Sequence, residues 1–535
     1  MNTLTGTRKL IRLILRRDRV LLPLWVLFLA VVPLSYVASL NELTPTAAAR
    51  QAYADASVHN AGFVALYGPL SGASVGQLVA WRAGFIPVMI GLFCILTVIR
   101  HTRTEEEAGR RELVGAAVVG RHAGLAAALV TTFGATLVLG AVLALTMIGQ
   151  GLPAAGSWAF AAEFAASGWV FAAVAAVAAQ LSGSARGARA IAMVTLGAAF
   201  VLRLIGDISG LGDGALAWLS WLSPIGLVHR IHPYSVDRWW PAALAAGVSA
   251  ALAVVAVALS ARRDVGAGLL PPRLGPASAA PALRSPLALS WRLHRGLLAG
   301  WVVGFAVVGV AIGGIAEGIG DLVRDNRELL QVFQRVGGVN GAIDSLFASM
   351  IGGLGLVAAG YAIQATLRLR EEEVAGRAEP VLSTATGRLR WAGSHLAFSL
   401  LGPAAVLAAT GLGMGLTHGL NTGDVGGQVP RVLAAAMVQL PAVWVLAAVA
   451  VVLFGVVPRF AAASWAALVA CLVLLLLGTT LRFDQWVLDL SPFTHLPHLP
   501  GGELTPTPLV TLTAVAAALT AVGLAGLRRR TIPST

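Results

Sequence analysis

Long apolar runs, separated by short polar segments, dominate the pattern of residues along the chain. A helix needs about 20 apolar residues to cross the hydrocarbon core of a bilayer, and the runs have this length. The alternation of polar and apolar residues that marks the strands of a membrane β-barrel is missing. We therefore predict an all-α polytopic membrane protein, because a helix satisfies its own backbone hydrogen bonds in lipid. Twelve spans are predicted, at 20–40, 83–100, 123–148, 158–182, 188–207, 241–260, 297–316, 350–367, 393–416, 431–457, 460–480 and 509–527.

The first 19 residues follow a different pattern. Leucine and isoleucine residues between 10 and 15 are mixed with basic residues between Arg8 and Arg19. This mixture predicts an amphipathic helix, 1–19, that lies in the membrane interface. The apolar run that follows is too long for a signal peptide, and no small-residue cleavage site comes after it. We therefore expect this run to be retained as the first span.

The composition is that of a membrane protein. Hydrophobic residues make up 57% of the chain and charged residues 12%, against about 25% charged residues in soluble domains. The net charge of +13 would suggest a nucleic-acid partner in a soluble protein. Here, however, most of the 38 Lys and Arg residues fall in segments on the side of the two termini. The positive-inside rule then predicts a multi-pass protein of the cytoplasmic membrane, with both termini cytoplasmic and no nucleic-acid partner.

The two halves of the chain repeat three short motifs in the same order. The paired segments lie 266 to 276 residues apart and are 19–25 with 295–301, 105–110 with 371–377, and 222–224 with 490–492. Each half has six predicted spans, and an even number gives both halves one orientation, so we predict two parallel six-helix repeats. The predicted domains are the halves 20–261 and 287–535, joined by a cytoplasmic linker, 262–286, that is rich in Pro, Ala and Arg.

Three consecutive glutamates follow the second span of each half, and we call these stretches the tri-glutamate segments. They consist of Glu105, Glu106, Glu107, Gly109 and Arg110 in the first half, and of Glu371, Glu372, Glu373, Gly376 and Arg377 in the second. An acidic run in a loop is usually a solvated face. These runs, however, begin at the predicted cytoplasmic end of a span, recur in both halves, and precede helix-compatible stretches, 111–119 and 378–389. The second copy has one extra residue, Val374, before Ala-Gly-Arg, which predicts that the two copies are not equivalent.

This layout resembles the permease subunits of type-2 ABC exporters, which have six spans per unit, an interfacial N-terminal helix and a cytoplasmic coupling helix after the second span. The fused form, with E-E-E and A-G-R followed by L-S-P in each half, is similar to the actinobacterial tetronasin/polyketide antibiotic and multidrug exporter family. The resemblance implies that the tri-glutamate segments begin two cytoplasmic coupling helices, which contact two copies of a separate P-loop ATPase subunit.

The same resemblance implies that the partner subunit binds ATP and Mg²⁺, whereas this chain holds no cofactor and has no enzyme active site. The sequence agrees, because a P-loop needs a lysine after a glycine. The only lysine in the sequence, Lys9, follows an arginine.

Candidate residues for a substrate path or an outer gate lie toward the other side of the membrane. They are Glu163, Arg203, Asp207, Pro224 and Pro492. Ionisable residues inside spans often have a function, but Arg203 and Asp207 are four residues apart near a span end, so we expect a structural pair. Glu163 has no predicted neighbour, and it either contacts a cationic substrate or reaches the surface. Both prolines belong to L-S-P motifs, which predict a proline-broken, partly re-entrant outer helix.

Pairs of histidines follow both L-S-P motifs, at His229 and His232 and at His495 and His498. Such a spacing is compatible with a metal ion. No cysteine or acidic cluster completes either set, so we predict no metal site.

The spans otherwise contain few polar groups, which suits hydrophobic or amphipathic small molecules such as antibiotics, drugs or lipids. We predict the permease subunit of an ATP-driven exporter, surrounded by membrane lipid. The alternative is a twelve-span ion-coupled secondary transporter for drug efflux, which would need an acid or a histidine near the midplane; Glu163 is the nearest candidate. A membrane enzyme is a further alternative, because the outer loops carry acids, although without a paired motif. These acids are Asp321, Asp325, Asp344 and Asp424.

Overall fold

The computed structural model describes residues 3–58, 61–211, 214–271, 277–281, 283–325, 338–477 and 484–531. All regular elements in these residues are helices, and 12 of the helical segments are long and apolar enough to cross a membrane. The predicted all-α polytopic fold is therefore confirmed. The chain forms two compact units, Met1–Gly275 and Pro276–Thr535.

Unit one contains fourteen α-helices among its described residues. They are α1 (Thr7–Arg17), α2 (Leu21–Leu43), α3 (Ala47–Val58), α4 (Ala61–Tyr67), α5 (Val75–Arg82), α6 (Ile86–His101), α7 (Arg103–Glu107), α8 (Arg110–Gly115), α9 (Ala123–Gly149), α10 (Ala154–Leu181), α11 (Ala185–Gly210), α12 (Leu219–Leu222), α13 (Pro224–His229) and α14 (Trp240–Ala261). Helix α10 is the most buried of the candidate spans and packs against α6, α9 and α14. Its alanine-rich sequence allows this, since small side chains let helices approach closely in a membrane.

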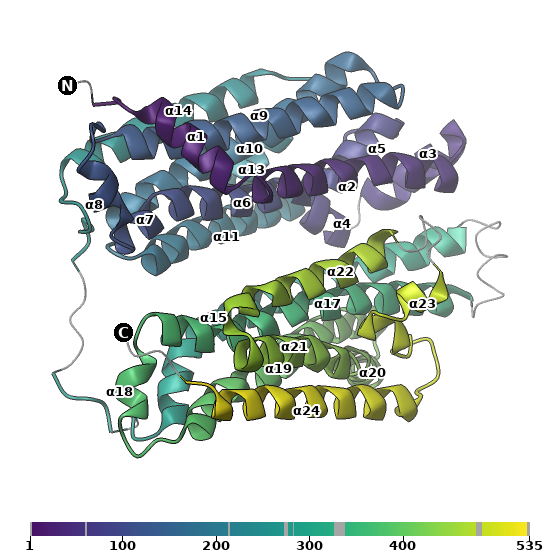
Figure 1. Ribbon diagram of the computed structural model, residues 1–535. Coiled ribbons are helices and arrows are strands. Elements are labelled where there is room, and N and C mark those ends of the chain that lie inside the picture. The colour runs from purple at the N-terminus through teal and green to yellow at the C-terminus, as the bar shows by residue number, and fades with distance from the viewer. Residues whose placement is uncertain are drawn as a thin grey trace. The chain divides into compact units, whose positions relative to one another are not determined.

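Helices α7 and α8 lie at the end of unit one where the chain begins, and α3 and α5 lie at the other end (Figure 1). The amphipathic helix α1 stops at Asp18, and α2 starts separately at Leu21. Asp18 is buried, and its carboxylate accepts a 2.5 Å hydrogen bond from His101 Nε2 and lies 3.1 Å from Arg100. The joint between α1 and α2 is thus tied to the end of α6.

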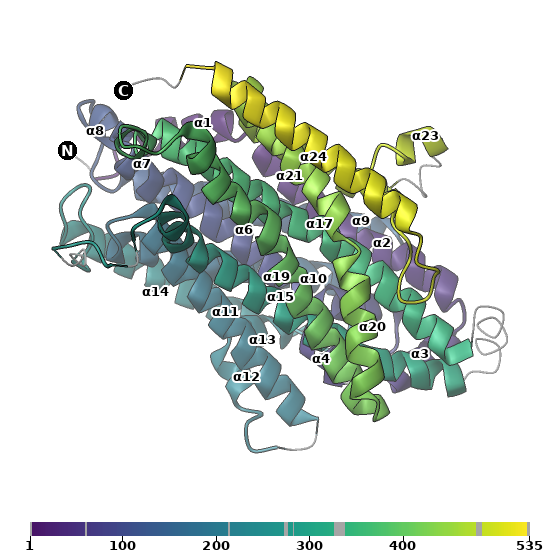
Figure 2. The same ribbon diagram turned by 90° about the horizontal axis from the view of Figure 1, so that it is seen from below.

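Unit two contains α15 (Pro286–Asp325), α17 (Gly338–Val374), α18 (Ala378–Leu382), α19 (Arg388–Thr422), α20 (Val425–Met437), α21 (Leu440–Val456), α22 (Ser464–Leu477), α23 (Gln485–Leu488) and α24 (Pro506–Arg529). Figure 2 shows α24 running along α21, and α18 lies at the end of unit two where the chain ends (Figure 1). The segment before the seventh span continues into that span as a single 40-residue helix, α15. Unit two therefore has no counterpart of the joint at Asp18.

Several predicted spans differ from the helices of the structure, among them the second and the tenth. The second span begins at Val75 and not at 83, because Ser74 and Gln77 form a capping box that starts α5. The apolar pattern does not predict this extension, because Gln77 and Arg82 are polar. In the structure Arg82 donates hydrogen bonds to the hydroxyl of Tyr53. The tenth span is divided into α20 and α21, which separate after Met437.

The segment expected to link the halves, 262–286, contains the boundary between the two units. Its first part packs on unit one, because the N–H groups of Leu269 and Leu270 donate to the carbonyl oxygens of Gln180 and Leu181. This packing brings Arg263 into the interior of unit one, where it reaches a tri-glutamate segment.

Candidate functional site

Each tri-glutamate segment turns at its glycine. Gly109 has a φ of 68° and Gly376 a φ of 69°, both in the left-handed region where only glycine is free of strain. The turn separates α7 from α8 in unit one and α17 from α18 in unit two. The Ala-Gly-Arg motif therefore marks a sharp corner between the end of a span and a short helix.

Glu106 is the centre of the first segment, and its side chain is only 1% exposed. Its carboxylate lies 2.6 Å from Arg103 and 2.9 Å from Arg263, and it also pairs with Arg111. Arg263 follows α14, so this one carboxylate joins α7, α8 and the end of the sixth span. A buried charge needs such compensation, because removal from water is costly for every ion in the group.

The other two glutamates of the first half bind different elements. Glu105 accepts hydrogen bonds from Arg17 at 2.6 Å and from Arg110 at 2.7 and 2.8 Å, and so ties α1 to the corner. Glu107 accepts a 3.1 Å hydrogen bond from the N–H of Ala185, the first residue of α11. A carboxylate at this place is favoured by the positive end of the helix dipole.

The second segment is built in the same way. Both carboxylate oxygens of Glu373 accept hydrogen bonds from Arg530, each at 2.7 Å, and Arg530 directly follows α24. Glu372 lies 2.8 Å from Arg368 and 2.8 Å from Arg377. Glu371 differs, because its side chain is 61% exposed and its carboxylate contacts Arg368 through one nitrogen, Nη1.

The ion pairs of the two clusters have the same spacing in the sequence, and we call this correspondence the register of the repeat. The pairs Glu106–Arg263 and Glu373–Arg530 each join residues 157 positions apart. The corresponding members of the two pairs lie 267 positions apart in the sequence. Each half thus uses a glutamate after its second span to hold an arginine that follows its last span.

This register overturns one interpretation of the sequence. With Arg110 paired to Glu105 and Arg377 paired to Glu372, both five residues apart, no residue is inserted in the second copy. Val374 is the counterpart of Glu107, so the interpretation of Val374 as an extra residue is wrong. The two tri-glutamate segments differ in chemistry and not in length, because a valine cannot accept the hydrogen bond that Glu107 receives.

We expect the Glu373–Arg530 pair to be energetically coupled. Glu373→Ala and Arg530→Ala should each lower the free energy of unfolding by about 3–5 kcal/mol, because either change leaves a buried charge unpaired. The double variant should fall short of the sum by about 1–3 kcal/mol in a double-mutant cycle on the solubilised protein. The pair Glu371–Arg368, whose glutamate is 61% exposed, serves as the control, with a coupling of about 0–1 kcal/mol. Equal coupling in the two pairs would contradict the assignment.

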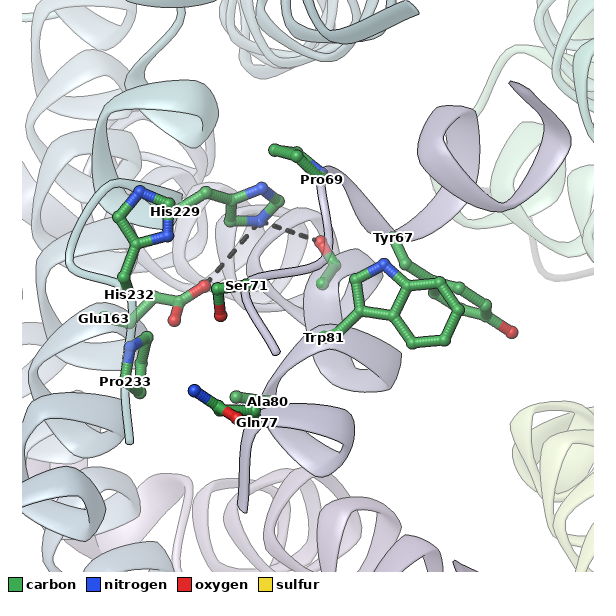
Figure 3. Close-up of a pocket in the computed structure, with 11 residues that line it drawn as sticks. Tyr67, Pro69, Ser71, Gln77, Ala80, Trp81, Glu163, His229, His232 and Pro233 are labelled. Atoms are coloured by element: carbon green, nitrogen blue, oxygen red, sulfur yellow. Dashed lines mark hydrogen bonds and ion pairs between the residues drawn. The ribbon is translucent and has the colours of Figure 1, made fainter. Parts of the chain in front are cut away.

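Glu163 lies in α10 and is buried beside a small cavity of about 30 Å³. The carboxylate and His229 point toward one another, with 3.7 Å between Glu163 Oε1 and His229 Nε2 (Figure 3). Burial and the nearby Arg203 guanidinium lower the pKa of His229 to about 3, so the imidazole is neutral. His229 also contacts the carbonyl oxygen of Gly84 at 3.1 Å. The sequence does not indicate this neighbour, because Glu163 and His229 lie 66 positions apart on different helices.

Arg203 and Asp207 lie on one face of α11, as the sequence predicts, with 3.9 Å between Nη1 and Oδ2. Both have further partners. The fully buried Arg203 donates to the carbonyl oxygen of Ala65, and Asp207 accepts a 2.7 Å hydrogen bond from Ser220. Together they hold α4 and α12 against α11.

Pro224 and Pro492 each occupy the first turn of a short helix whose N-cap is the serine of the L-S-P motif. The hydroxyl of Ser223 also donates to the carbonyl oxygen of Ala199 in α11. Within the described residues, no group of three potential metal ligands comes together. His495 instead contacts the carbonyl oxygen of Asp489 at 2.9 Å.

The outer acids considered for an enzyme have structural partners where their side chains are described. Asp344 pairs with Arg431, and Asp424 caps the start of α20 by accepting a 2.9 Å hydrogen bond from the N–H of Gly427. The side chains of Asp321 and Asp325 lie outside the described residues.

The fold and the paired clusters define a twelve-span, internally duplicated membrane protein of the transporter type. The family model described as "Multidrug efflux system permease Rv1217c, C-terminal domain" matches residues 8–259 and 283–528, one segment in each half. The chain belongs to this family. It is 46% identical to the multidrug efflux system permease protein Rv1217c of Mycobacterium tuberculosis over 530 residues, which cover 99% of this chain and 95% of that protein.

Proposed function

We propose that this chain is the permease subunit of an ATP-driven exporter that moves hydrophobic or amphipathic compounds out of the cell. In this proposal ATP and Mg²⁺ bind to a separate P-loop ATPase, present in two copies, and both termini of the permease lie in the cytoplasm. Family membership supports efflux of drug-like compounds, because the relative is named as a multidrug efflux permease. The observation that carries ATP coupling is the pair of buried ion-pair clusters.

The clusters give a physical route from the tri-glutamate segments to the membrane. A partner that presses on α8 moves Glu106, and Glu106 holds the arginine that follows α14. In unit two the contact to α18 runs through Glu372, which pairs with Arg377 at the start of that helix, while the adjacent Glu373 holds Arg530 at the end of α24. Two packed elements joined by buried ion pairs move together, because separation would leave charges unpaired. The glutamates therefore link the corner to the spans, while the exposed parts of α8 and α18 remain for the partner.

Purification of the tagged chain from its native host tests the partnership. We expect an ATPase with a P-loop to copurify, and ATP to drive export from reconstituted vesicles without a proton gradient. Transport that follows a proton gradient and needs no ATP would instead establish the ion-coupled alternative. In that case Glu163→Gln should abolish transport, whereas an ATP-driven exporter should retain most of it.

Arg263→Met and Arg530→Met test the route itself. In a reconstituted complex we expect ATP hydrolysis to continue while export falls at least about tenfold, a change of about 1.4 kcal/mol in coupling. Glu371→Ala is the matched control, because this exposed carboxylate joins no second element. Export at the normal rate in both arginine variants would overturn the assigned role of the clusters.

A further inference from the structure

A cavity of about 420 Å³ lies beside the first tri-glutamate segment, between α1, the end of α6, α8 and the start of α9. Its apolar surface comes from Leu10, Leu13, Ile14, Val119 and Val265. Cavities of this size accommodate a small molecule or part of a lipid, and this one combines an apolar wall with a group of charged residues.

The cavity is held open by ties at both ends of α1. The N–H groups of Gly120 and His122 donate to the carbonyl oxygens of Thr5 and Thr3, at 2.8 and 3.1 Å. At the other end Arg17 binds Glu105 at 2.6 Å. Helix α1 is therefore fixed at both ends, and the cavity lies between α1 and the corner.

The charged groups of the cavity favour an anion. Its lining contains the arginines Arg17, Arg110, Arg111 and Arg121 and the two acids Glu105 and Glu112. Arginine has five N–H donors in a planar fork that suits phosphate. Arg121 donates through Nη2 to the carbonyl oxygens of Ser260, Ala261 and Arg263, and its other donors make no hydrogen bond to the described residues. With the buried Glu106, which pairs with Arg111, four arginines stand against three acids, so positive charge still exceeds negative charge beside the apolar wall.

The second half has different residues at two positions equivalent to lining residues of the cavity. At the 267-residue spacing, Gly124 of the cavity corresponds to Trp391, which is buried in one cluster with Leu369 and Ala378. Arg111 corresponds to the same Ala378, which has no charge. A Cβ placed on Gly124 would meet nothing within 4 Å. The first half therefore has a glycine and an arginine where the second half has a buried tryptophan and an alanine.

We infer that this cavity binds an anionic phospholipid of the inner leaflet, with its phosphate at the arginines and the start of an acyl chain along α1. The position supports this ligand, because α1 is amphipathic and the positive-inside distribution predicts that it lies at the cytoplasmic surface. Basic pockets on the cytoplasmic side of membrane proteins suit anionic headgroups. The inference does not depend on the proposed transport mechanism, since the cavity is formed by unit one alone.

Native mass spectrometry of the full chain tests this site. The protein is released from nanodiscs that contain equal amounts of phosphatidylglycerol and phosphatidylcholine, and retained lipids are counted. We expect preferential retention of phosphatidylglycerol, and at least a fivefold loss of this lipid in Gly124→Trp, which copies the second half. Gly134→Trp is the matched control, because Gly134 also lies in α9 with nothing within 4 Å, and it should leave retention unchanged.

A second cavity variant keeps the test decisive if Gly124→Trp does not fold. Leu13→Glu places a negative charge in the apolar wall at a half-exposed position, and it should also lose phosphatidylglycerol. Retention equal to wild type in both cavity variants would overturn the site. Equal retention of the two lipids would show an apolar surface without headgroup recognition. Full displacement of the lipid by sn-glycerol 3-phosphate would show a phosphate site that makes no use of the apolar wall, and both results contradict the inference.

Discussion

Glu106→Ala is expected to lower the free energy of unfolding of the solubilised protein by about 3–5 kcal/mol, because it removes one partner of a buried ion group. The side chains of Glu106 and Arg103 are 1% and 0% exposed, so water cannot replace the lost carboxylate. Arg263 loses its link to α7 in the same step. Thermal or denaturant unfolding in detergent, followed by tryptophan fluorescence, measures the change.

Glu371→Ala is the control for this prediction, because it removes a glutamate from the other tri-glutamate segment at an exposed position. We expect its stability to stay within about 0.5 kcal/mol of wild type, the usual range for surface substitutions. Glu106→Gln keeps the shape of the side chain but not its charge, and its loss of stability should lie between those of Glu371→Ala and Glu106→Ala. Similar stability of Glu106→Ala and Glu371→Ala would show that the buried cluster does not hold the corner.

Gly84→Ala is expected to lower the free energy of unfolding by about 1–3 kcal/mol and to disturb the packing around the Glu163 cavity. A Cβ on Gly84 would lie 1.9 Å from the carbonyl oxygen of Tyr67. That backbone cannot retreat easily, because Trp81 Nε1 donates a 2.8 Å hydrogen bond to the next carbonyl oxygen, that of Gly68. The free energy of unfolding is again the measurement.

Gly134→Ala provides the contrast for this second prediction. Gly134 lies inside α9 with no atom within 4 Å of an added Cβ. Alanine favours a helix over glycine by about 0.5–1 kcal/mol, so this variant should be as stable as wild type or slightly more stable. Equal losses in both variants would argue against the close approach of Gly84 to Tyr67.

The sequence predicts the spans well because lipid imposes a length and a polarity that few other structures share. It predicts the position of the tri-glutamate segments, which directly follow a span, but not their partners. Arg263 and Arg530 lie 157 residues from their glutamates, and no local pattern connects such distant positions. The internal repeat contains the necessary signal, since both arginines stand at the same distance from equivalent glutamates.

The charged pairs Arg203–Asp207 and Glu163–His229 show which contacts the sequence can predict and which it cannot. Arg203 and Asp207 could be paired from the sequence because they are four residues apart on one helix. Glu163 and His229 could not, because they are 66 positions apart and the second half repeats neither residue at this register. Such pairs depend on how α13 packs against α10, which only the three-dimensional structure provides.

The arginines after the last spans also set an order for biosynthesis. The chain is synthesised from its N-terminus, so the carboxylate of Glu106 cannot pair with Arg263 until all six spans of its half have been made. In the second half, Arg530 follows α24, so Glu373 likewise has no partner until the last span of its half has been made. Each half can therefore complete its buried cluster only after its sixth span, and a nascent chain that stops one span early exposes unpaired charge.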